Sequence, residues 1–162
     1  MKILFVCSSN VCRSPYCEFI FRRMVKESEI LTKIVDDVRS AAVFNRSAEL
    51  HSKARVSLLA QGFSENEVDA HKPAFKFGDA KLFESADVII GMTKFHKWLT
   101  PRKYRSKFTT LSQIATNKYT PIEDPFLKKS QEGYNSIMEQ LYMYLKAYAT
   151  KLEVEYNKRV VL

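Results

Sequence analysis

Cysteine is scarce in this sequence, and its distribution excludes a framework of structural disulfides. The 162 residues include only three cysteines, at positions 7, 12 and 17, and none follows Cys17. An odd number gathered near one end differs from the even sets found in disulfide-rich secreted domains. Free thiols fit a reducing compartment, so we expect a cytoplasmic protein.

Long hydrophobic runs are also lacking. No stretch approaches the length that a helix needs to span a bilayer. Lys2 is followed by only a short apolar run before Cys7, which is too short for the apolar region of a signal peptide. No group of metal ligands occurs at a recognised spacing, so we expect neither a metal nor another cofactor.

Repeats, low-complexity tracts and interdomain linkers are absent too. The length suits one domain, and 46% hydrophobic residues are enough to build a core. We therefore expect a single domain over residues 1–162. Residues 157–162 are expected to form a loose tail.

Acidic residues are outnumbered, at 18 Asp and Glu against 26 Lys and Arg, which gives a formal charge of +8. This balance favours anionic partners such as phosphoproteins, nucleic acid or acidic membrane surfaces. The densest basic stretch, residues 94–107, has aromatic residues between its cations. Nucleic-acid binding is one interpretation. Because no nucleic-acid-binding motif accompanies the charge, we prefer a solvated helix and loop.

Apolar runs alternate with helical patterns along the chain. Strands are predicted over residues 2–7, 33–42, 86–92 and 108–111. Helices are predicted over residues 15–29 and 47–62, from the third strand to about residue 99, and over residues 131–155. This alternation predicts an α/β fold, with a four-stranded parallel sheet covered by helices on both faces.

The strongest functional signal is the segment from Cys7 to Pro15, with the sequence CSSNVCRSP. It places a cysteine, five residues and then an arginine between a buried strand and a helix start. Backbone N–H groups and the helix dipole can bind a phosphate there and also favour a Cys7 thiolate. Arg13 can grip two phosphate oxygens, while Ser14 and Pro15 suit the N-cap and first helical positions. The alternative is a buried strand cysteine followed by a solvated arginine.

This segment closely resembles the active-site loop of the low-molecular-weight protein tyrosine phosphatases, which typically reads C-x-G-N-x-C-R-S-P. The resemblance implies a flavodoxin-like four-stranded fold and a catalytic pair, Cys7 and Arg13. It also implies a phosphate-binding loop built from Ser8, Ser9, Asn10, Val11, Cys12 and Ser14. Ser9 stands where the family usually has glycine. That departure makes a non-catalytic phosphate- or phosphotyrosine-binding module the main alternative.

A second resemblance lies far along the chain, at Ile122-Glu123-Asp124-Pro125-Phe126. Alone it could be an ordinary Asp-Pro turn. It resembles the family's Asp-Pro-aromatic loop, which makes Asp124 the expected general acid for the leaving oxygen. Phe126 is expected to form one wall of the substrate pocket. Leu127 takes the place of a second aromatic residue at the pocket rim.

Further residues are carried over from the family pattern. Ser40 and His71 resemble a serine and a histidine that bond the loop asparagine, here Asn10. Phe44 and Arg46 lie where the family has a variable entrance loop. The resemblance also implies that Cys7 and Cys12 can form a reversible disulfide under oxidants.

These residues predict a metal-independent phosphatase that hydrolyses phosphotyrosine in proteins through a phosphocysteine intermediate. Phosphate and other oxyanions are expected to inhibit it. Apolar Val11 favours an aromatic ring, whereas related phosphoarginine phosphatases tend to carry threonine there, so that activity is an alternative. An arsenate reductase is a weaker alternative, because thioredoxin-linked versions need a cysteine pair that this chain lacks after Cys17.

Overall fold

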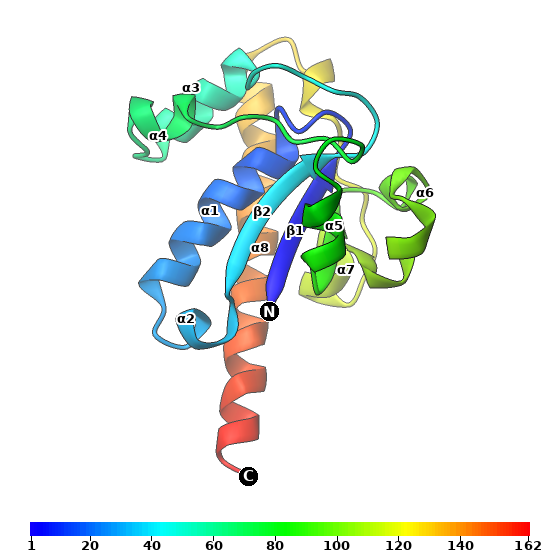
Figure 1. Cartoon of the computed structure of the whole chain (residues 1–162). Helices are drawn as coiled ribbons and strands as arrows, with labels where there is room; N and C mark the ends of the chain where they lie inside the picture. The colour runs from blue at the N-terminus through cyan, green and yellow to red at the C-terminus, as the bar shows by residue number, and fades with distance from the viewer.

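The computed structural model describes all 162 residues and has one four-stranded parallel sheet, whose first two strands lie side by side in Figure 1. Its strand order is β2-β1-β3-β4, the winding of flavodoxin-like folds. The strands are β1 (Lys2–Cys7), β2 (Asp37–Ala42), β3 (Val88–Gly91) and β4 (Phe108–Thr110). The predicted four-stranded parallel sheet is therefore confirmed.

Strand β1 is central, because β2 and β3 pair with it on either side. Ile3 to Cys7 are all buried, as expected for a strand with helices on both faces of its sheet. Cys7 pairs with Ala42 at the carboxyl ends of both strands. This is the edge at which parallel sheets bind ligands.

The two faces of the sheet are covered by different elements. On one face α1 (Arg13–Glu27) packs against α8 (Gln131–Val160), and the larger buried core includes Ile3 and Phe5 of β1. The opposite face packs Leu4 and Val6 into a smaller core with Phe83 of α5 (Ala80–Ser85). The alternation of β1 side chains between these cores follows from the pleat of the strand.

Short helices connect these layers. They are α2 (Leu31–Ile34), α3 (Ser52–Ala60), α4 (Glu65–Asp69), α6 (Phe95–Leu99) and α7 (Leu111–Thr116), with 3-10 turns η1 (Arg102–Lys107) and η2 (Pro125–Leu127). None of the helices combines the length and the apolar character that a bilayer crossing requires.

Several predicted boundaries are wrong. The strand expected from residue 33 begins at Asp37, because residues 31–34 form α2 and Leu31 packs into the core. The helix expected over 47–62 is shorter, since α3 begins only after the His51 N-cap. The tail expected from residue 157 is helical as far as Val160, because no proline or glycine interrupts the end of α8.

Candidate active site

The loop of residues 8–12 connects β1 to α1 at the carboxyl edge of the sheet. Asn10 has a φ of 56°, and its two neighbours in the loop have negative φ values. Asparagine tolerates this left-handed conformation better than most residues. Ser9, in the place of the family glycine, is not required to adopt a left-handed backbone. Its hydroxyl instead donates to Asn45 Oδ1 at 2.6 Å.

The backbone N–H groups of this loop are available to a ligand. Those of residues 8–12 donate to no backbone carbonyl of the protein. Buried or half-buried N–H groups normally find an acceptor, so several free donors in one tight loop are typical of an anion-binding nest. The loop therefore offers donors where a phosphate group would meet Cys7.

Cys7 is buried at the start of the loop, and its Sγ lies 3.0 Å from Ser14 Oγ. Asn10 Nδ2 donates to the same hydroxyl oxygen at 2.8 Å. Because that oxygen already accepts, the Ser14 hydroxyl proton is free to point at Cys7. The expected N-cap role of Ser14 is wrong: α1 begins earlier, at Arg13, with Cys12 at the N-cap and no side-chain cap.

Arg13 and Asp124 come together although 110 residues separate them in the chain. Arg13 is only 4% exposed, and its Nη1 donates to the Ile122 carbonyl at 3.0 Å. Its Nη2 lies 3.4 Å from Asp124 Oδ2. The other Asp124 oxygen accepts from the Phe126 N–H at 3.0 Å, a cap that fixes the carboxyl group at the start of η2.

These groups surround one pocket of about 450 Å³. Its lining includes Cys7, Arg13 and Asp124, together with loop residues Ser8, Ser9, Val11 and Cys12. Phe44 and Phe126 add exposed aromatic walls. The pocket thus combines an anion-binding floor with an apolar rim, as is typical of sites for organic phosphates.

Two residues predicted for the pocket lie elsewhere. The Arg46 guanidinium packs over the Phe75 ring, 5.3 Å from its centroid, and is not part of the lining. Leu127 is in η2 and largely exposed, away from the cavity. Asn45 and Ser47, which the sequence did not single out, line the pocket instead.

Of the two residues expected to bond Asn10, only His71 contacts it. Ser40 Oγ donates to Glu18, a buried carboxylate of α1, rather than to Asn10. The Asn10 side-chain oxygen accepts from the Ala74 N–H at 3.0 Å. His71 lies beside the Phe19 ring, and burial lowers its pKa, although Glu18 and the Asn10 carbonyl oppose that shift. Ser40 therefore does not bond Asn10, whereas His71 contacts the backbone of Asn10 directly.

His96 is a site residue that the sequence did not indicate. Its Nδ1 accepts from the backbone N–H groups of Met92 and Thr93, at 3.2 and 3.3 Å. The ring proton therefore sits on Nε2, which lies 3.2 Å from Ser8 Oγ and can donate to it. Burial, with a smaller effect from Arg13, lowers the pKa of His96 to about 3, so the ring is neutral at physiological pH.

The other two cysteines have raised pKa values. All three thiols are free and buried. Burial raises the pKa of Cys12 to about 12 and that of Cys17 well above its ordinary value. The Tyr134 hydroxyl lies against Cys12 and has no other partner, and burial raises its pKa. Cys12 and Cys17 are thus protonated thiols at neutral pH.

Known proteins resemble the chain over nearly its whole length. A family model for the low molecular weight phosphotyrosine protein phosphatases matches residues 2–158. The protein-arginine-phosphatase of Bacillus subtilis (strain 168) is 31% identical over 158 residues, covering 90% of this chain and 97% of that protein. The low molecular weight protein-tyrosine-phosphatase PtpB of Staphylococcus epidermidis is 29% identical, covering 97% of this chain and all of that protein.

Solved structures agree with these sequence matches. The YwlE arginine phosphatase from Geobacillus stearothermophilus superposes with a TM-score of 0.80 at 26% identity, covering 97% of this chain and 96% of that one. A low molecular weight protein tyrosine phosphatase from T. tengcongensis gives 0.74 at 28% identity, covering 93% and 99%. Since the family model and these folds span the catalytic loop and the sheet, the chain belongs to the low molecular weight phosphotyrosine protein phosphatase family and is a cysteine-dependent phosphatase.

Proposed function

We propose that the enzyme hydrolyses phosphotyrosine in proteins, with Cys7 as the nucleophile, Arg13 as the phosphate-binding residue and Asp124 as the general acid. The observation that carries this proposal is the single pocket that these three residues share with Val11, Phe44 and Phe126. The polar floor suits a phosphate dianion. The apolar side chains suit the aromatic ring that carries it.

In the first step, the Cys7 thiolate attacks phosphorus as the bond to the tyrosyl oxygen breaks. The sulfur–phosphorus bond forms, and Asp124 gives its proton to the departing oxygen. Arg13 and the loop N–H groups bind the three equatorial oxygens, where negative charge is held in the transition state. Ser14 stabilises the thiolate before attack through the contact between its Oγ and Cys7 Sγ.

In the second step, water attacks the phosphocysteine. Asp124, now a carboxylate, accepts a proton from that water, and the sulfur–phosphorus bond breaks. The electron pair returns to Cys7 as a thiolate, which Ser14 stabilises again. Inorganic phosphate is released, and we propose that phosphate and similar oxyanions inhibit by occupying the same nest.

Phosphoarginine is a second candidate substrate. Two observations favour it: the B. subtilis relative with 31% identity is named a protein-arginine-phosphatase, and the YwlE arginine phosphatase from G. stearothermophilus superposes with a TM-score of 0.80. Against it, Val11 lines the pocket without a hydrogen-bonding group for a guanidinium. An aromatic ring has no hydrogen-bond donors to satisfy at an apolar wall, whereas the N–H donors of a guanidinium remain unpaired there. The pocket therefore supports phosphotyrosine better.

The substrate assignment is tested with matched peptides that carry either phosphotyrosine or phosphoarginine. Wild type is expected to have the higher kcat/KM for phosphotyrosine, and Cys7→Ser should abolish turnover of both. Asp124→Ala should slow phosphotyrosine hydrolysis by about 100-fold or more, because the phenolate leaves unprotonated. A higher kcat/KM for phosphoarginine would replace the proposal with the second candidate.

We also propose that the protein acts in the cytoplasm. The support is chemical, since all three cysteines are free and the reaction needs a reduced nucleophile at Cys7. Its partners are then phosphoproteins of that compartment.

A further inference from the structure

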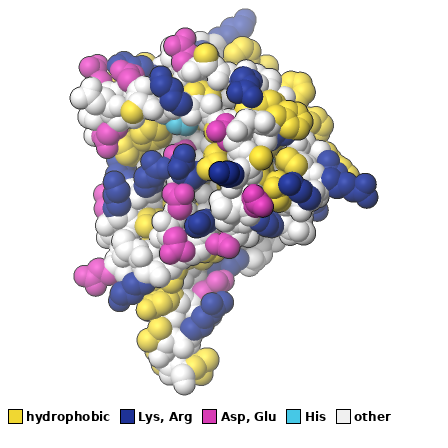
Figure 2. All heavy atoms as spheres, in the orientation of Figure 1, with side chains coloured by type: hydrophobic (Ala, Val, Ile, Leu, Met, Phe, Trp, Pro, Cys, Tyr) yellow, Lys and Arg dark blue, Asp and Glu magenta, His cyan; other side chains and the backbone are white.

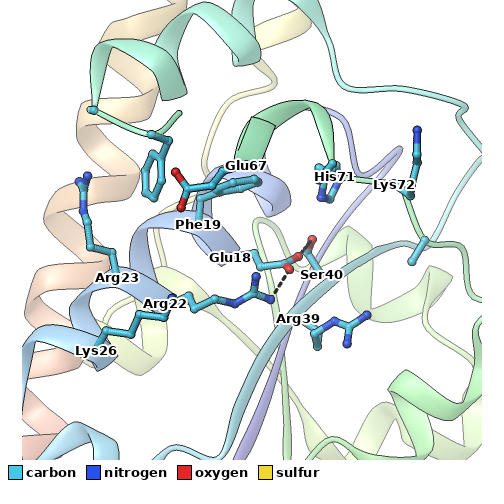
Figure 3. Close-up of a pocket in the computed structure, with 14 residues that line it drawn as sticks. Glu18, Phe19, Arg22, Arg23, Lys26, Arg39, Ser40, Glu67, His71 and Lys72 are labelled. Carbon is cyan, nitrogen blue, oxygen red and sulfur yellow. Dashed lines mark hydrogen bonds and ion pairs between the residues drawn. The ribbon is translucent and has the colours of Figure 1, made fainter. Parts of the chain in front are cut away.

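A second pocket, larger than the active-site pocket, lies beside α1 and β2. Its volume is about 620 Å³, which is within the range of small-molecule sites. Figure 3 shows its walls, which come from α1, from β2 and from the segment that follows α3 and includes α4. We call it the α1–β2 pocket. It shares no lining residue with the active-site pocket.

The α1–β2 pocket is strongly basic. Five cations line it against two carboxylates; the cations are Arg22, Arg23, Lys26, Arg39 and Lys72. Figure 2 shows Lys and Arg side chains gathered on this face, over α1 and β2. Clustered charge of one sign at a concave surface concentrates ligands of the opposite sign.

Both carboxylates already accept hydrogen bonds from protein partners. Glu18 accepts from Arg22 at 2.6 Å with one oxygen and from Ser40 with the other (Figure 3). One Glu67 oxygen accepts from the Ser64 backbone and hydroxyl in the capping box of α4. Only Glu18 is paired with a cation of the pocket, so the five cations keep an excess of positive charge over the two carboxylates.

Three of the cations have no partner of their own. Lys26, Arg39 and Lys72 form no ion pair and donate no side-chain hydrogen bond. In Figure 3 the Arg39 side chain extends from β2 and the Lys72 side chain from the segment after α4, and their charged ends point in different directions. Rotation about the flexible Lys72 stem would let its ammonium join Arg39 on one phosphate group.

The remaining wall is aromatic. The Phe19 and Phe63 rings meet edge to face at 5.2 Å, and the Arg23 guanidinium covers Phe63 at 4.6 Å from its centroid. The Nε2 atom of His71 is buried in the same pocket without a hydrogen-bond partner.

We propose that the α1–β2 pocket is a second anion-binding site, which takes the phosphate group of a small organic phosphate with a flat apolar body. Arg39 and Lys72 bind the phosphate, and the body packs against Phe19 and Phe63. The site is independent of the catalytic chemistry, because none of these residues lines the active-site pocket.

The pocket is nevertheless connected to the catalytic loop. Ala74 lines it, and the Ala74 N–H donates to Asn10 Oδ1 at 3.0 Å. Asn10 in turn donates to Ser14, which contacts Cys7. A ligand that holds Lys72 also restrains the segment that positions Asn10.

The test titrates phenylphosphonate, a non-hydrolysable organic phosphate analogue, into isotope-labelled full-length protein while backbone amide NMR signals are followed. Two groups of signals are expected to saturate with separate affinities. One group belongs to residues 8–14, and the other surrounds Arg39 and His71. Binding, not turnover, is measured, so the result does not depend on the proposed catalytic function.

The double variant Arg39→Ala/Lys72→Ala identifies the site. Both side chains are exposed, so the fold should persist. The affinity of the second group should fall at least about tenfold, with the first group unchanged within about twofold. The matched control Lys146→Ala/Lys158→Ala removes the same charge from exposed positions of α8 and should retain both affinities.

Three outcomes would overturn the proposal. One is saturation of the loop signals alone. Another is an unchanged second affinity in the Arg39→Ala/Lys72→Ala variant. The third is equal or tighter binding of inorganic phosphate at the second group, because that anion lacks the flat body assigned to the aromatic wall. Binding of phenylphosphonate at the second group that is tighter than that of inorganic phosphate would support the proposal.

Discussion

Ser14 Oγ stands 3.0 Å from Cys7 Sγ and at the same time accepts from Asn10 Nδ2 at 2.8 Å. Because the serine oxygen already accepts from the asparagine, its proton is free to point at Cys7, the proposed nucleophile. Asn10 is itself held by the Ala74 N–H and by its left-handed backbone. In the proposed mechanism this chain of side chains within the loop acts on the Cys7 thiolate in addition to the helix dipole.

Removing the serine hydroxyl tests this chain. Ser14→Ala should lower kcat and the rate of Cys7 alkylation by iodoacetamide at mildly acidic pH, each by about tenfold, because a hydrogen bond to the thiolate is lost. Ser57→Ala changes a serine of similar burial in α3 and should leave both rates intact. Equal rates in Ser14→Ala and wild type would show that the contact does not stabilise the thiolate.

Restoring the family glycine at position 9 should change little. Only Asn10 adopts a positive φ in the loop, so Ser9 carries no left-handed strain for a glycine to relieve. We expect Ser9→Gly to leave kcat within about twofold and to lower thermal stability slightly, through greater freedom of the unfolded chain. A large gain in kcat would mean that Ser9 compromises the loop after all.

His96 predicts a specific pH dependence of stability. Its folded pKa of about 3 lies below the unfolded value near 6.5, so the unfolded chain binds the proton first as pH falls. The free energy of unfolding should therefore decrease between pH ~6.5 and ~3, by roughly 3 to 5 kcal/mol from this residue. Denaturant titrations of wild type and His96→Gln measure this slope. The free energy of unfolding of His96→Gln should fall less steeply over this pH range. Identical slopes in the two proteins would contradict the low pKa of His96.

Thiol reactivity should distinguish the three cysteines. Because burial raises the pKa of Cys12 and Cys17, both stay protonated and inert at neutral pH. Mass mapping after brief iodoacetamide treatment of native protein should find Cys7 modified and the other two unmodified. Phosphate should slow the modification by covering the nest. Equal labelling of Cys12 would argue against its buried thiol form.

A single substitution at Val11 should move substrate preference. Val11→Thr keeps the side-chain volume and adds a hydroxyl at the pocket wall, where a guanidinium could donate to it. We expect the ratio of kcat/KM for phosphoarginine over phosphotyrosine to rise about tenfold. Val11→Ala serves as the control for lost volume. If the kcat/KM ratio rose equally in Val11→Ala, a hydrogen bond from the added hydroxyl would not explain the change.

The catalytic loop and the sheet were predictable because their signals are local. Cys7 and Arg13 lie within one strand–loop–helix segment, and the loop carries its own geometry. Asp124 was recognised by its motif, and the structure brings it to Arg13. The start of α1 was misplaced because Ser14 and Pro15 form a good helix start, but the loop already becomes helical at Arg13.

Contacts between residues far apart in the chain leave no comparable pattern in the sequence. His96 reaches Ser8 only because β3 pairs beside β1, and a single histidine in a basic stretch does not reveal that pairing. Arg46 follows Phe44 closely in sequence, but its guanidinium finds the Phe75 ring, a partner brought near by a later segment. Ser40 was expected to reach Asn10, yet the nearer Glu18 carboxylate of α1 accepts its proton.

The most direct test of the catalytic account is to trap the phosphocysteine. Asp124→Asn, mixed rapidly with p-nitrophenyl phosphate in EDTA and acid-quenched, should carry one phosphoryl group on the peptide that contains Cys7. A nitrophenolate leaving group needs little protonation, but hydrolysis of the intermediate needs the missing base. A phosphoryl group on Cys7, absent from Cys7→Ser, is the predicted result. Turnover by wild type with no phosphoryl group on Cys7 in the variant would contradict the account.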